Sequence, residues 1–141
     1  MPDDFDRSKS LQELEQMDCG EPKFGSSLVI TVHRLRRKPL ADFTIEDLRR
    51  MIGQKLSLPY LMPLALERLE ENPLAEGDCY DGDLLHNVLR VGSEYWANEP
   101  NYRNRVRAAL DRAKKMLPSF DEIARKTIEE VLRDASSSLK E

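Results

Sequence analysis

The sequence predicts an all-α fold, a compact single-domain bundle of about six or seven helices. Apolar residues recur at spacings of three and four in several segments, which is the period of a helix with one buried face. Helix-capping signatures stand in front of three segments, and no hairpin or alternation of strands with helices is visible. The length of 141 residues suits one domain. We expect the helical domain to span residues 10–135, between a flexible N-terminal arm at 1–9 and a frayed tail at 136–141.

The first two helices are predicted directly after the arm. Ser10 and Glu13 form a capping box, in which each side chain accepts a hydrogen bond from the backbone N–H of the other residue. A second helix is expected over residues 28–37. The β-branched run at 29–32 leaves a strand open as the alternative there.

The centre of the chain carries the clearest helix start. Thr44 is placed as the N-cap with Asp47 at the third helical position, while Phe43 and Leu48 form a hydrophobic staple. A second central helix is predicted over residues 58–71 from an apolar stripe. The stripe consists of Leu58, Leu61, Met62, Ala65, Leu66 and Leu69.

Three further segments complete the predicted bundle. Asp83 is expected to cap a short helix, and residues 93–99 are expected to form a turn. A long helix follows over residues 100–118, and a capping box at 119–122 predicts the last helix. The inner stripe of that last helix is predicted to be Phe120, Ile123, Ala124, Thr127, Ile128, Val131, Leu132 and Ala135.

The composition narrows the class of protein. The chain has 22 basic and 26 acidic residues, a net charge of −4, and 40% apolar residues, which is typical of a folded domain. No run approaches the roughly 20 apolar residues that cross a bilayer. The N-terminus is polar and lacks an apolar signal region. We therefore expect a cytoplasmic protein that does not contact membranes, with Cys19 and Cys79 as reduced thiols.

No catalytic, cofactor or metal site is predicted. Cys19, Cys79, His33 and His86 stand singly, without the paired spacing of a zinc site, and no nucleophile motif or phosphate-binding glycine loop is present. The acidic segment at residues 76–83 does not match a calcium-binding EF-hand loop either. If Gly82 is placed at position six of such a loop, a cysteine falls at position three, where an oxygen ligand is required. Two histidines can still meet in space, so an enzyme remains a third hypothesis.

An acidic cluster is the most informative charge pattern. Seven acids stand between residues 67 and 83 against one base, Arg68. Three of the acids share a helix face, where like charges cost roughly 0.2–0.5 kcal/mol per pair. The cluster therefore indicates a docking surface for a basic partner, with a tyrosine as anchor, and a solvated face is the alternative. The predicted binding residues are Glu67, Glu70, Glu71, Glu76, Asp78, Tyr80, Asp81 and Asp83.

Basic residues provide a different hypothesis. Residues 33–38 end one predicted helix with a run of cations, and residues 103–115 carry six more, namely Arg103, Arg105, Arg107, Arg112, Lys114 and Lys115. A helical regulatory or adaptor module that contacts nucleic acid through residues 103–115 is therefore the alternative function. The net charge of −4 and the spread of these cations around their helix argue against it.

Over roughly residues 20–100 the chain resembles one bacterial family. The matching runs are Arg37–Leu40, Asp42–Arg49, Ile52–Gln54, Pro63–Glu67, Leu69–Asp78, Tyr80, Gly82–Leu85 and Val88–Val91. They resemble the immunity proteins of contact-dependent growth inhibition (CDI) systems. The run from Glu70 to Asp83 is the most specific part, although Cys79 and Asp81 replace an aromatic residue and a proline that are usual in the family.

The resemblance implies a non-enzymatic antitoxin in the cytoplasm. Such proteins bind the C-terminal toxin domain of a large exoprotein and cover its active site. Many of these toxins are nucleases, so the expected partner is a basic protein domain. The resemblance leaves the toxin's reaction and the oligomeric state of this chain open.

Overall fold

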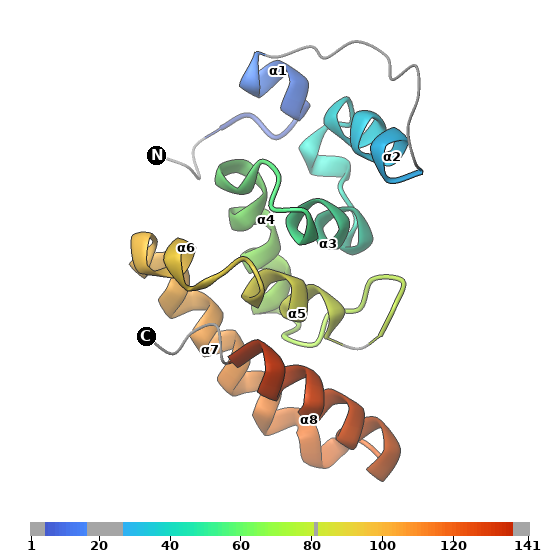
Figure 1. Cartoon of the computed structure of the whole chain (residues 1–141), viewed down its shortest axis with the longest axis vertical. Coiled ribbons are helices and arrows are strands. Elements are labelled where there is room, and N and C mark those ends of the chain that lie inside the picture. The colour runs from blue at the N-terminus through green and yellow to red at the C-terminus, as the bar shows by residue number, and fades with distance from the viewer. Residues whose placement is uncertain (1–4, 17–26, 81, 137–141) are drawn as a thin grey trace.

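Eight α-helices and two short 3₁₀ turns make up the part of the chain that the computed structural model describes, which is residues 5–16, 27–80 and 82–136 (Figure 1). The helices are α1 (Leu11–Glu15), α2 (Ser27–Arg36), α3 (Ile45–Gly53), α4 (Leu58–Glu71), α5 (Asp83–Leu89), α6 (Ser93–Asn98), α7 (Pro100–Met116) and α8 (Glu122–Ser136). The 3₁₀ turns are η1 (Leu40–Asp42) and η2 (Leu117–Ser119). The predicted all-α fold is confirmed, and the strand alternative for α2 is wrong.

Two helix starts form as the sequence predicts. At α1, Ser10 accepts a hydrogen bond from the Glu13 N–H, and the Glu13 carboxylate accepts one from the Ser10 N–H. At α3, Thr44 and Asp47 exchange the same pair of bonds, at 3.1 and 3.0 Å. Because both boxes satisfy N–H groups that the first helical turn leaves unpaired, these two boundaries are set by local sequence alone.

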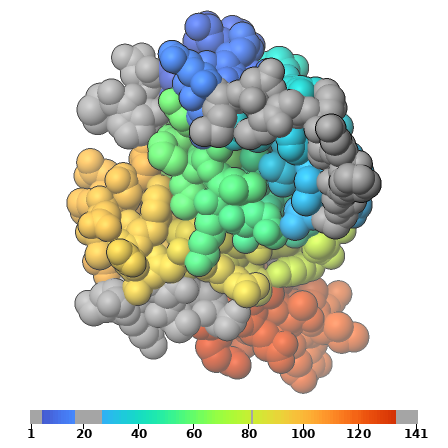
Figure 2. Space-filling view, turned by 45° about the horizontal axis from the view of Figure 1, so that its top comes forward, coloured from blue at the N-terminus to red at the C-terminus, as the bar shows by residue number. Residues whose placement is uncertain are grey.

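The core forms where α3, α5 and α7 pack against α4. The apolar stripe of α4 is buried from Leu61 to Leu69, and α5 buries one face that consists of Leu84, Leu85, Val88 and Leu89. At the far end of the molecule from α1 and α2, α8 packs on α5 and α7 (Figures 1 and 2). Among the described residues, every helix is too short or too polar to serve as a membrane span.

The C-terminal elements differ from the prediction at three points. Residues 93–98 form α6 rather than a turn, because Trp96 is drawn into the core. The cap of α8 is Asp121, whose carboxylate accepts the Ala124 N–H at 2.8 Å, since the expected cap residue lies within η2. Ile123 is 82% exposed, whereas Ile128 is buried. Five residues separate the two isoleucines, which puts them about 140° apart around the helix.

The N-terminal arm contacts the body of the protein where it is described. Its backbone carbonyls at Arg7 and Lys9 accept hydrogen bonds from residues 41 and 40, at 2.8 and 3.0 Å. Phe5 meets the Tyr60 ring edge to face, with 5.2 Å between the ring centroids. The arm's flexibility stays a prediction, but residues 5–9 are held by η1 through backbone hydrogen bonds and by the first turn of α4 through Tyr60.

Candidate functional site

The loop that joins α4 to α5 folds back on the core rather than extending into solvent. Leu74 and Ala75 are buried, and the Leu74 N–H is bonded to the Asn72 side chain at 3.1 Å. At the other end, Gly82 donates its N–H to the Leu74 carbonyl at 3.2 Å and adopts a φ of 85°. Because this backbone conformation strains most side chains, a glycine is favoured where the loop closes.

Asp83 holds the tip of this loop from inside the protein. Its carboxylate accepts the N–H groups of Gly77, Cys79 and Tyr80 at 2.7, 3.0 and 3.3 Å and lies 3.7 Å from the Arg49 guanidinium. The side chain is 1% exposed. The predicted N-cap role is therefore wrong, because the preceding glycine is the cap and the carboxylate turns back to the loop.

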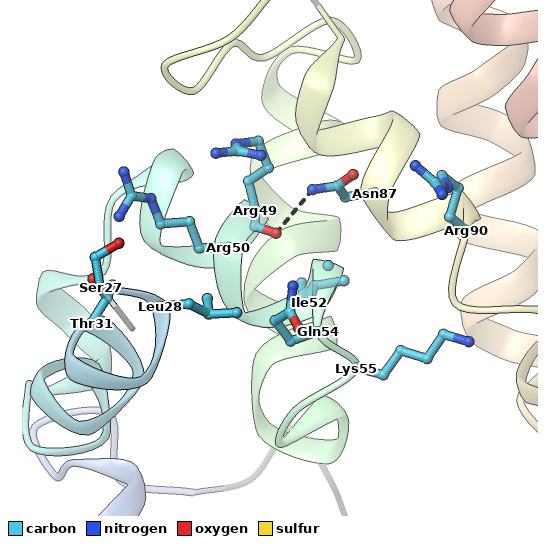
Figure 3. Close-up of a pocket in the computed structure, with 11 residues that line it drawn as sticks. Ser27, Leu28, Thr31, Arg49, Arg50, Ile52, Gln54, Lys55, Asn87 and Arg90 are labelled. Atoms are coloured by element: carbon cyan, nitrogen blue, oxygen red, sulfur yellow. Dashed lines mark hydrogen bonds between the residues drawn. The ribbon is translucent and has the colours of Figure 1, made fainter. Parts of the chain in front are cut away.

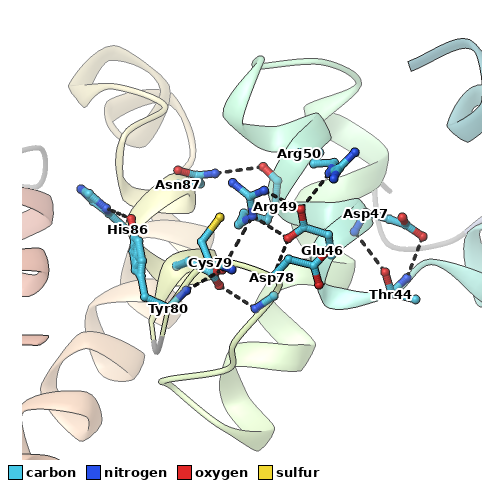
Figure 4. A network of polar contacts seen from close by, with 12 residues as sticks. Thr44, Glu46, Asp47, Arg49, Arg50, Asp78, Cys79, Tyr80, His86 and Asn87 are labelled. Carbon is cyan, nitrogen blue, oxygen red and sulfur yellow. Dashed lines mark hydrogen bonds and ion pairs between the residues drawn. The ribbon is translucent and has the colours of Figure 1, made fainter. Parts of the chain in front are cut away.

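A second carboxylate, that of Glu46 on α3, lies beside the loop and also holds it (Figure 4). It accepts hydrogen bonds from the side chains of Arg49 and Arg50, and from the Asp78 N–H at 2.8 Å. These bonds, chiefly those from Arg49, outweigh burial and lower the Glu46 pKa to about 2. A β-carbon at Gly77 would lie 2.5 Å from the Glu46 carboxylate, so a larger residue there would displace this carboxylate from its present position.

Tyr80 is packed against α5 rather than fully exposed. Its hydroxyl lies 2.6 Å from Nδ1 of His86, and burial raises the tyrosine pKa. His33 lies on α2, where it lines an apolar hollow, so the two histidines have different surroundings. Among the described residues, no three His, Cys, Asp or Glu side chains are grouped in a way that could hold a metal ion.

In addition to Asp83, two of the predicted acidic residues form ion pairs. Glu67 accepts two hydrogen bonds from Arg7 of the N-terminal arm, one at 2.7 Å. Glu70 accepts two from Arg105 on α7, at 2.9 and 2.8 Å, and its carbonyl accepts one from Arg112. These contacts lower the pKa of both carboxyls. The expected like-charge cost is thus offset by cations from distant segments.

The predicted acidic surface is divided into two groups. Glu67 and Glu71 line a hollow of 360 Å³ beside the N-terminal arm, while Glu76 and Asp78 line another of 490 Å³ beside α3. Glu71, Glu76 and Asp78 are exposed. Asp81 lies outside the described residues. The exposed acids therefore form a surface on both sides of the segment that leads into α3, rather than one compact patch.

Some of the basic residues of α7 form hydrogen bonds within the protein. Arg105 and Arg112 are bonded to Glu70, whereas Arg107, Lys114 and Lys115 are exposed. The nucleic-acid hypothesis therefore loses two of its six cations to internal contacts.

Sequence reasoning missed the part that α3 plays in the site. Glu46, Arg49 and Arg50 stand three and four positions apart, which is the spacing of ion pairs along one helix face. That spacing was visible in the sequence. The contact of Glu46 with a loop 32 residues away was not, because it depends on how α3 and α5 pack.

Comparison with protein families identifies the class of this chain. A family model described as CDI immunity proteins matches residues 13–106, which is more than half of the chain. The matched region contains the whole loop together with α3 and α5, which hold it. A search of curated proteins found no match. The chain belongs to the family of CDI immunity proteins.

Proposed function

We propose that this chain is an antitoxin that binds the C-terminal toxin domain of a CDI exoprotein and neutralises it in the cytoplasm by covering its active site. It acts by binding and not by catalysis. The observation that carries this proposal is the fixed loop between α4 and α5, which lies within the family match. The carboxylates of Asp83 and Glu46 accept hydrogen bonds from backbone N–H groups of this loop, while Glu76 and Asp78 remain exposed.

A loop that is already ordered favours tight binding. Ordering a flexible segment on association costs binding free energy, and a loop held by Asp83 and Glu46 avoids most of that cost. Asp83 thus contributes indirectly, because its carboxylate faces inward. The contact residues that we propose are the exposed Glu71, Glu76 and Asp78, with Tyr80 as a half-buried anchor at the edge.

The ion-paired acids extend this surface. The Arg7–Glu67 and Arg105–Glu70 pairs are only partly buried, with the glutamates 44% and 46% exposed. Pairs of this kind contribute about 0–1 kcal/mol, so a partner's cations can displace them at small cost. We include Glu67 and Glu70, and Asp81 by its place in the loop sequence, in the proposed surface.

The partner's chemistry follows from this charge. A basic domain, such as a nuclease with a cationic substrate groove, would be steered toward the acidic surface, which raises the association rate at low salt. A stable complex needs about 800 Å² of buried surface per partner. Covering a nuclease groove over such an area excludes its nucleic-acid substrate.

Charge reversal tests the proposal. The C-terminal domain of the exoprotein encoded beside this chain, inactivated by mutation, is titrated with the wild type and with the variant Glu71→Lys, Glu76→Lys, Asp78→Lys. We expect at least a tenfold loss of affinity, mainly through slower association, and a weaker dependence on salt. The control is Glu94→Lys, Asp111→Lys, Glu130→Lys, which makes the same change of charge at exposed positions on other helices.

Equal affinities of the triple variant and the control would refute the acidic surface. Failure of the wild type to bind, or to protect cells that produce the active toxin domain, would refute the antitoxin role itself. A separate assay tests whether the toxin is a nuclease. It measures whether the active domain degrades RNA or DNA, and whether the wild-type chain inhibits that degradation.

A further inference from the structure

A basic groove lies beside the acidic loop. It has a volume of 660 Å³ and runs between α2, the end of α3 and α5. Four of its lining residues are basic, namely Arg49, Arg50, Lys55 and Arg90, and none is acidic (Figure 3). Four basic side chains thus line one groove of a protein whose net charge is −4.

The floor of the groove is fixed by the packing of α3 against α5. The side chain of Asn87 donates a hydrogen bond to the Arg49 carbonyl at 3.0 Å. A β-carbon at Gly53 would approach Asn87 Nδ2 to 3.0 Å, so glycine allows this close contact. The groove is therefore part of the helix packing and does not depend on the arrangement of a loose loop.

The four basic residues of the groove differ in whether their side chains already form ion pairs within the protein. Arg49 is committed to Glu46 through two nitrogens, and Arg50 is bonded to the same carboxylate through Nε. Lys55 and Arg90 are exposed, and within the described residues their side chains make no hydrogen bond or ion pair. These two positive charges are therefore available to a ligand at the edge of the groove.

An apolar strip continues from the groove along α2. Leu28 lines both the groove and a neighbouring hollow of 320 Å³, whose other walls include Val29, Val32 and Leu56. Within this strip, Leu28 and Val29 are 41% and 40% exposed, although aliphatic side chains favour burial. Four cations and an apolar strip thus lie side by side on one face.

We propose that this groove binds a segment of the same toxin domain that carries carboxylates beside an apolar side chain. Carboxylates complement the cations, and an apolar side chain would cover the strip on α2. The proposal rests on the antitoxin function above. A nucleic-acid ligand is less favoured, because the groove lacks an aromatic side chain on which a base could stack.

Arg50 connects the two surfaces. It lines the basic groove and also the hollow that contains Glu76 and Asp78. The negative and positive surfaces are therefore adjacent at Arg50, and one partner can contact both. Such an alternation of charge selects for a partner with the complementary alternation, and it excludes basic proteins that match the acidic loop alone.

The experiment reverses the two available cations. The variant Lys55→Glu, Arg90→Glu is titrated with the inactivated toxin domain, next to the control Arg107→Glu, Lys114→Glu on α7. Both variants make the chain more acidic by the same amount. We expect the groove variant to bind at least tenfold more weakly at low salt, while the control binds a basic toxin as tightly as the wild type or more tightly. Leu28→Ser is expected to accelerate dissociation with little dependence on salt.

The outcomes separate this inference from the function on which it rests. If the wild type binds the toxin domain and the groove variant binds it with the same affinity, the proposed groove site is refuted and the antitoxin role is not. Equal losses in the groove variant and the control also refute the groove site, because they show an effect of net charge alone. A gel shift of RNA that the groove variant abolishes, with toxin binding unchanged, identifies a nucleic-acid site instead. Circular dichroism checks that every variant is folded.

Discussion

Single carboxylates determine the shape of the candidate site. The Asp83 carboxylate binds three backbone N–H groups, and Glu46 binds a fourth together with two arginines. Of these contacts, only the pairing of Glu46 with its two arginines was visible in the local sequence. Asp83 stands where an N-cap is expected, and only the folded loop shows that its side chain turns the other way. Residue types at helix starts are predictable, but the direction of a buried side chain depends on tertiary packing.

Loss of the Asp83 carboxylate should loosen the loop and destabilise the fold. Asp83→Ala removes a buried carboxylate and leaves three partly buried N–H groups without this acceptor, which costs about 2–4 kcal/mol in the free energy of unfolding. Urea denaturation measures this loss. Asp78→Ala is the matched control, because it removes an exposed carboxylate from the same loop and should change stability by less than about 0.5 kcal/mol. Equal stability of the two variants would contradict the internal role of Asp83.

Glu46 should make stability depend on pH in the acid range. Its folded pKa of about 2 lies below the ordinary glutamate value of 4.5, so ionised Glu46 stabilises the fold. This contribution is complete above pH 4.5 and is lost as the pH falls towards 2, amounting to about 3 kcal/mol. The difference in unfolding free energy between the wild type and Glu46→Gln should therefore shrink from pH 6 to pH 2. A constant difference between pH 6 and pH 2 would argue against the paired carboxylate.

At the scale of elements, local signals were reliable where a helix start is governed by its own residues. The capping boxes at Ser10 and Thr44 form as predicted, and the stripe of α4 is buried. The prediction for α8 was weaker, because eight apolar or small positions were assigned to one face. A helix that packs along one side buries only part of such a wide stripe, and the sequence does not indicate which part.

The two isoleucines of α8 provide a direct test of its orientation. Ile128→Ala should cost about 2–4 kcal/mol, since it removes buried methyl groups and leaves a cavity. Ile123→Ala should change stability by less than about 0.5 kcal/mol, because that side chain is exposed. Thermal or urea unfolding of the two variants gives the comparison. The opposite order of stability would mean that α8 packs through its other face.

At the scale of the molecule, the ion pairs and the groove join segments that lie far apart in the chain. Arg7 meets Glu67 across 60 residues, and the groove brings α2, α3 and α5 together. Local sequence patterns do not predict contacts between residues that are so far apart in the chain. The family match also ends at residue 106, within α7, although Ile128 and Leu132 of α8 belong to the same core as the matched helices.

Removal of α8 should therefore damage the whole domain. A chain that ends at residue 119 loses two buried aliphatic side chains and exposes the surfaces of α5 and α7 that they cover. At about 2 kcal/mol for each buried side chain, the loss is a large part of the roughly 5–15 kcal/mol that stabilises a domain. We expect a clearly lower melting temperature by circular dichroism. An unchanged melting temperature would show that the core ends with the family match.

The single tryptophan has a practical consequence for all of these measurements. Trp96 is 1% exposed, touches the edge of Tyr95, and has an indole N–H without an acceptor among the described residues. An indole so shielded from water fluoresces at short wavelength and shifts to the red when the protein unfolds. The helix α6 contributes no residue to the acidic surface or to the groove. The fluorescence of Trp96 should therefore change when the protein unfolds and should not change when a partner binds.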